Sequence, residues 1–81
     1  MNKELAKKFL FLVNDQSFSE LIEYIDSRIS YHKDQLALAN DMEKVRTHQG
    51  SIQELLRLKQ LRTSVLNALG KLDEKGNPKI N

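Results

Sequence analysis

The sequence predicts an all-α fold, in which a short N-terminal helix is followed by a long antiparallel helical hairpin. Apolar side chains recur every three or four residues from end to end, and no alternating stretch is long enough for a strand. Apolar residues make up 40% of the 81 residues, which is enough for a compact core. Only one proline and three glycines interrupt the helical pattern. We therefore expect a single helical domain over residues 1–81.

The first predicted helix covers about residues 2–13. Leu5, Phe9 and Leu12 follow one another at spacings of four and three. Its end is apolar all round, so we expect it to be covered on two sides. In a monomer this stretch would leave an exposed patch, and such patches mark interfaces. The predicted apolar interaction residues are Phe9, Leu10, Phe11, Leu12 and Val13.

Two longer helices follow, over about 18–38 and 42–69. Ser17 with Glu20, and Asn40 with Glu43, have the spacing of capping boxes at their starts. The apolar seam of the first comprises Phe18, Leu21, Ile22, Ile25, Ile29, His32 and Leu36. The face of the second comprises Met42, Val45, Gln49, Ile52, Leu55, Leu56, Leu58, Leu61, Val65 and Leu69. Gly70 suits a left-handed C-cap, and we expect the tail, 71–81, to be loose.

Gly50 leaves two alternatives for the hairpin: it is either the turn or a small residue inside a long third helix. The apolar period continues across it through Val45, Gln49 and Ile52. We favour a turn near Ala39–Asp41, with Gly50 where two backbones approach closely. The third helix is then longer than the second, and the first helix is the nearest element that can cover the C-terminal end of the third.

Charge divides unevenly between the two long helices. Residues 15–43 hold seven acidic and two basic side chains, a net charge of −5. Residues 44–71 hold six basic and one acidic, a net charge of +5. This division favours antiparallel pairing of the two helices within one hairpin. The alternative is complementarity between subunits.

No reactive constellation is present, so we expect no catalytic residues, no cofactor and no enzymatic activity. The chain has no cysteine, its glycines are isolated, and its serines lack a nucleophile-elbow setting. With a turn at Ala39–Asp41, His32 and His48 would face each other across the hairpin. Two imidazoles are too few for an ordinary metal site, and we expect none.

Two sets of side chains are candidates for binding a partner. Arg46, Arg57, Lys59 and Arg62 form a predicted basic face, although no aromatic residue interleaves with them. Tyr24 and Tyr31 are seven residues apart, hence on one helix face, where together with arginines from a neighbour they would hold a base or nucleotide. Such tyrosines more often pack at helix–helix contacts.

The stretch from Phe9 to Leu69 resembles short helical proteins of tailed bacteriophages. The resemblance rests on the apolar run Phe9-Leu10-Phe11-Leu12, the polar Asn40-Asp41 break, and the element Arg46-x-x-Gln49-Gly50-x-Ile52-x-x-Leu55-Leu56-x-Leu58. Members of that group often carry a Trp where this chain has Phe18. Their genes often lie among virion and head-assembly genes, and no activity is established for them. The resemblance therefore implies a virion structural or assembly component.

A second likeness is to the small phage hairpin proteins that sequester the cyclic nucleotides of CBASS defence. Arg46-Thr47-His48-Gln49-Gly50 is similar to their Arg-Thr-His element before a Gln-Gly. Their downstream aromatic-Met and Arg-Ala pattern is missing, so the likeness is mainly architectural.

The leading hypothesis is a non-enzymatic phage protein that acts through protein–protein contacts, with itself or another virion protein as partner. The alternative is an anti-defence or host-modulating protein that binds a cyclic nucleotide or a host factor. Either would work in the host cytoplasm or, for the first, in the virion. We expect no membrane partner, because no stretch approaches a membrane span.

Overall fold

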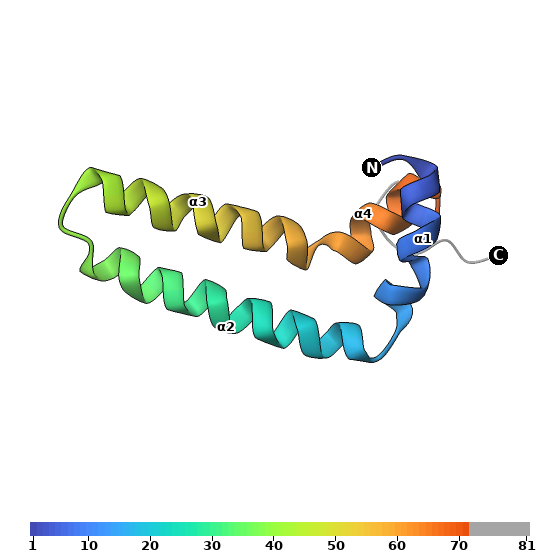
Figure 1. Cartoon of the computed structure of the whole chain (residues 1–81), viewed down its shortest axis with the longest axis horizontal. Helices are drawn as coiled ribbons and strands as arrows, with labels where there is room; N and C mark the ends of the chain where they lie inside the picture. Colours follow the sequence, from blue (N-terminus) through green and yellow to red (C-terminus); the bar gives the residue numbers. More distant parts are fainter. Residues whose placement is uncertain (72–81) are drawn as a thin grey trace. The chain divides into compact units, whose positions relative to one another are not determined.

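A computed structural model describes residues 1–71, and over this range the chain is entirely helical outside its turns (Figure 1). The helices are α1 (Lys3–Asn14), α2 (Ser17–Leu38), α3 (Met42–Lys59) and α4 (Leu61–Ala68). The predicted all-α class is confirmed. The expectation of a loose tail concerns residues that lie almost entirely outside the described range.

The described chain divides into two compact units, and the expectation of a single helical domain over residues 1–81 stays a prediction. One unit holds Met1–Ser19 together with the chain from Gln60 onward, and the other is Glu20–Lys59. Helix α2 begins in the first unit and continues into the second. The boundary at Lys59–Gln60 coincides with the break between α3 and α4.

Helix α1 is capped at both ends by the residues that flank it. The Asn2 Oδ1 atom accepts a hydrogen bond from the Leu5 amide at 2.8 Å, which satisfies one of the free amides of the first turn. The Asp15 amide closes the other end by donating to the Leu12 carbonyl at 3.2 Å. These bounds agree with the predicted helix to within one residue.

The start of α2 differs from the predicted capping box. The helix begins at Ser17 itself, and the Ser17 hydroxyl donates to the Asp15 carboxylate. The Phe18 amide donates to the Asp15 carbonyl at 3.0 Å, so the tight turn at Asp15–Gln16 leads directly into the helix. A carboxylate two residues upstream is a stronger acceptor for this hydroxyl than a neutral group would be.

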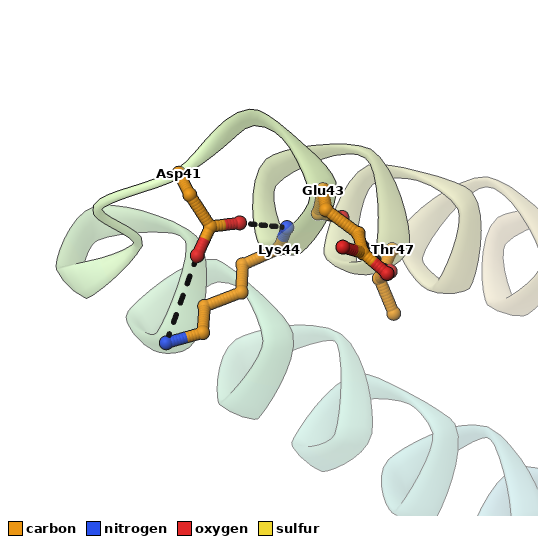
Figure 2. A network of polar contacts seen from close by, with 4 residues as sticks. All are labelled: Asp41, Glu43, Lys44 and Thr47. Carbon is orange, nitrogen blue, oxygen red and sulfur yellow. Dashed lines mark hydrogen bonds and ion pairs between the residues drawn. The ribbon is translucent and has the colours of Figure 1, made fainter.

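The turn between α2 and α3 lies where the sequence predicts it, but a different residue caps α3. Asp41 Oδ1 accepts from the Lys44 amide at 2.8 Å, and its other oxygen lies 3.8 Å from the Lys44 ammonium (Figure 2). Thr47 in the next turn donates to the Glu43 carbonyl. The prediction that Asn40 caps this helix is therefore wrong. Asp41 adds a negative charge at the positive end of the helix, which an asparagine cannot.

Gly50 lies inside α3 and not at a turn, as favoured from the sequence. The accompanying prediction of a close backbone approach is wrong, because a Cβ atom built at Gly50 would meet nothing within 4 Å. Gly50 therefore lowers the stability of α3, and no packing contact within the described chain requires a glycine at this position.

The predicted third helix, 42–69, is two helices in the structure. The backbone leaves the helical region at Gln60, where ψ is 12°. No glycine or proline marks this break. Beyond it, α4 packs against α1 in the first unit (Figure 1).

Gly70 ends α4 as the sequence predicts. Its φ of +68° is the left-handed conformation that glycine adopts without steric cost. The Gly70 amide donates to the Asn67 carbonyl and the Lys71 amide to the Leu66 carbonyl, at 3.0 and 2.8 Å. This pair of hydrogen bonds forms a Schellman motif.

The buried core is concentrated in the first unit. Its buried side chains are Ala6, Val13, Phe18, Val65 and Leu66. The predicted cover of Val65 by the first helix is confirmed, since α1 and α4 are in contact. In the second unit only Ile25 and Ile29 are buried, both on α2, and α3 contains no buried residue. Leu21, Leu56 and Leu58, all predicted to pack, are exposed.

Candidate interaction surfaces

The apolar stretch of α1 is buried on one side only within the described chain. Val13 is buried, Phe9 and Leu10 are half-buried, and Phe11 is 85% exposed. Val13 follows Ala6 by seven residues, so both lie on the face that packs toward the core, while Phe11 lies almost opposite Val13. The predicted cover on two sides is therefore not found here. An exposed phenylalanine remains.

A shallow depression adjoins this phenylalanine. Phe11, Leu12, Asn14 and Asp15 line it, so it has an apolar wall and a polar rim. The hydrogen bond from the Ser17 hydroxyl lowers the pKa of Asp15, which keeps a negative charge on that rim. We refer to Phe11, Leu12, Asn14 and Asp15 as the Phe11 surface.

The four basic residues predicted to share a face have different surroundings. The Arg57 guanidinium lies 3.0 Å from the Glu54 carboxylate, and the Lys59 ammonium lies 2.7 Å from that of Asp26 on α2. Arg46 is exposed on α3, and Arg62 is exposed on α4, in the other unit. Two of the four are thus engaged within the chain. Their role as a binding surface stays a prediction.

Tyr24 and Tyr31 are both exposed on α2, 62% and 45% respectively. Arg28 stands between them in sequence, and its guanidinium carbon lies 4.7 Å from the centre of the Tyr31 ring. Stacking of this kind holds a guanidinium on an aromatic face. Arg28 was not among the predicted site residues, although its spacing of four from Tyr24 and three from Tyr31 places it on the same helix face.

The two histidines meet, as the position of the turn predicts. The Nδ1 atoms of His32 on α2 and His48 on α3 lie 2.9 Å apart, and both rings are half-buried. The Tyr31 and His32 rings pack edge to face, with ring centres 5.1 Å apart. Burial lowers the pKa of His32, and the positive charges of His48 and Arg28 lower it further. The lowered pKa favours the neutral form of the His32 ring near pH 7, and in the hydrogen bond between the two rings one Nδ1 donates and the other accepts.

Two features of residues 1–71 bear on the class of site. No three His, Asp or Glu side chains of this range lie close enough together to hold a metal ion. No helix of the same range has the length and apolar character needed to span a bilayer.

Comparison with known proteins adds no relative. No family model, no curated protein and no solved structure matches this chain.

Proposed function

We propose that this chain is a non-enzymatic bacteriophage protein that acts through protein–protein contacts, most simply as a virion or assembly component. The observation that carries the proposal is the 85% exposure of Phe11 beside Leu12, Asn14 and Asp15. Burying a phenylalanine side chain at an interface contributes about 1.5–3 kcal/mol. The phage assignment rests on the resemblance of residues 9–69 to small helical phage proteins.

A thin core supports the need for a partner. In the second unit, Ile25 and Ile29 are the buried apolar residues, and α3 buries none. Chains of this size rarely obtain more than about 3–5 kcal/mol from one core. Association with a second copy or with another virion protein would supply the missing burial.

We also propose that α2 and α3 form an antiparallel hairpin. His32 with His48 and Asp26 with Lys59 are two contacts at increasing distance from the turn at Ala39–Asp41. Spin labels at Asp34 and Arg46, and at Ser27 and Arg57, test the arrangement. If the two helices lie side by side along their length, the two label pairs give similar distances. If the helices diverge away from the turn, the distance between Ser27 and Arg57 is much longer than that between Asp34 and Arg46.

Mass spectrometry of purified phage particles tests the proposed role. We expect the chain at a constant copy number per particle, and its absence from particles would contradict the virion role. A phage carrying Phe11→Asp should lose incorporation while the isolated variant keeps its helical circular-dichroism spectrum. Thr63→Asp, at an exposed position of α4, is the matched control and should be incorporated normally.

One specific observation favours the alternative, a cyclic-nucleotide-binding or host-factor-binding protein. Arg28 stacked on Tyr31, with Tyr24 on the same face, offers a cation and two aromatic rings to a phosphate and a base. Heat-denatured protein purified from a defended host should then release a nucleotide. Tyr31→Ala should abolish that release, whereas Phe11→Asp should not.

A further inference from the structure

We propose that the Phe11 surface binds a second copy of itself, with the two α1 helices antiparallel around a two-fold axis close to Phe11. This inference rests on the proposed function, since it names the partner of the same surface. A surface that pairs with its own copy through a two-fold axis must be self-complementary in shape and in charge. The Phe11 surface, together with Lys7 one turn before it on α1, meets both conditions.

The shape of the surface is self-complementary. Phe11 projects from α1 and is almost fully exposed, and the shallow depression beside it is lined by Leu12, Asn14 and Asp15 as well as by Phe11 itself. Around a two-fold axis the phenylalanine of each copy enters the depression of the other. Both projecting rings and both exposed Leu12 side chains are then buried in one step. The opposite face of α1 is already buried within the chain, so the dimer leaves that packing unchanged.

The charges on α1 are arranged for an antiparallel neighbour. Lys7 lies four residues before Phe11 and Asp15 four residues after it, and all three side chains are exposed. Residues at this spacing form a ridge along a helix, with about 6 Å between successive members. When a second α1 runs in the opposite direction with Phe11 against Phe11, the Lys7 ammonium of each copy therefore faces the Asp15 carboxylate of the other. A parallel neighbour would place Lys7 on Lys7 and Asp15 on Asp15, and like charges repel.

Both charges are available to a partner. The ion pairs within residues 1–71 join other side chains, and none of them involves Lys7 or Asp15. The Ser17 hydroxyl donates to the Asp15 carboxylate and holds it on the rim of the depression. A hydroxyl is neutral, so the carboxylate keeps its charge and its remaining lone pairs for a lysine. A second copy thus supplies an apolar cover for Phe11 and an opposite charge for each of the two ends of the ridge.

Sedimentation equilibrium of the purified chain tests the proposal. We expect a monomer–dimer equilibrium with a dissociation constant between about 1 μM and 1 mM, because the surface is small. Phe11→Asp should remain monomeric over this range while it keeps its helical circular-dichroism spectrum. A chain that stays monomeric up to about 1 mM would overturn the proposal. So would a Phe11→Asp variant that dimerises as tightly as the unaltered chain.

Reversal of the two charges tests the antiparallel register. Lys7→Glu alone and Asp15→Lys alone each bring like charges together at both ends of the interface, and each should raise the dissociation constant about 2–30-fold. The double variant should restore the dissociation constant of the unaltered chain. Lys33→Glu, at an exposed position of α2, makes the same change in net charge as Lys7→Glu and should have no effect.

The Lys7→Glu variant keeps the hydrogen bond between Ser17 and Asp15, so it tests the pairing even if Asp15→Lys disturbs the start of α2. An unchanged dissociation constant in Lys7→Glu would overturn the antiparallel pairing. The same conclusion would follow if the folded double variant dimerised no better than the two single variants.

The dimer and the proposed virion role can fail separately. If the chain stays monomeric but Phe11→Asp still prevents incorporation into particles, a different protein binds the Phe11 surface, and only the dimer proposal is wrong. If the chain dimerises with the expected response to charge reversal but is absent from particles, the dimer stands and the virion role is wrong.

Discussion

The Lys59 ammonium of α3 lies 2.7 Å from the Asp26 carboxylate of α2. This ion pair joins the acidic part of the chain to the basic part within one molecule, as the uneven division of charge predicts. Both side chains remain partly open to solvent, with exposed fractions of 42% for Lys59 and 49% for Asp26. We therefore expect the pair to contribute little to the stability of the fold.

A double-mutant cycle of Asp26→Asn and Lys59→Gln should give a coupling energy of about 0.2–1 kcal/mol, because the pair is half-exposed. Urea unfolding of the four proteins measures it. Repeating the cycle in 1 M salt should reduce the coupling, since salt screens exposed charges. The Glu54–Arg57 pair, one turn apart within α3, is the control and should give about 0.2–0.5 kcal/mol. A coupling above 2 kcal/mol for Asp26–Lys59 would contradict this account.

The two described glycines should respond oppositely to alanine. Gly50 lies in a helix with open space around it, so Gly50→Ala should stabilise the chain by about 0.4–1 kcal/mol. Gly70 has φ +68°, so Gly70→Ala should destabilise it by about 1–2 kcal/mol. Chemical denaturation measures both changes. Loss of stability in Gly50→Ala would mean that a neighbour approaches this glycine after all.

Alanine substitutions at Asp41 and at its neighbour Asn40 should have different effects on stability, because only Asp41 caps α3. Asp41→Ala should cost about 0.5–2 kcal/mol, because the Lys44 amide loses its acceptor. Asn40→Ala, at the position first assigned to the cap, should change stability by no more than about 0.5 kcal/mol. Equal losses in the two variants would show that both side chains share the cap. Thermal unfolding followed by circular dichroism gives the comparison.

Stability should fall on acidification between about pH 7 and 5, because the pKa of His32 lies below its ordinary value of 6.5. The unfolded chain takes up the proton at a higher pH than the folded chain does. The contribution is therefore fully present above pH 6.5 and is lost as the pH falls through the lower folded pKa. Urea unfolding at stepped pH values measures this loss.

His32→Gln should flatten the pH dependence over the same range, and His48→Gln should raise the pKa of His32 by removing a neighbouring positive charge. An NMR titration of the His32 ring reads this pKa directly. A His32 pKa at or above 6.5 in the unaltered chain would contradict the lowered value.

Local signals determined much of the fold from the sequence alone. The helical period predicts α1 and α2 closely, and Gly70 predicts the end of α4, because these features depend on residues within one or two turns. The meeting of His32 and His48 also follows from local information, since the position of one turn sets which residues face each other. The same reasoning predicted the wrong N-cap residue for α3, Asn40 instead of Asp41. Adjacent residues with similar side chains compete for one amide, and the sequence does not show which of them binds it.

Tertiary packing decided what the period could not. The sequence marks Phe9–Val13 as apolar all round, but the packing of the first unit buries Val13 and leaves Phe11 exposed. The break between α3 and α4 falls at Gln60, a residue with no helix-breaking character, and α4 beyond it packs against α1. Helix propensity acts over a few neighbouring residues, whereas burial depends on which distant helix packs against a face. The helices could therefore be predicted from the sequence, and the residues that they leave exposed could not.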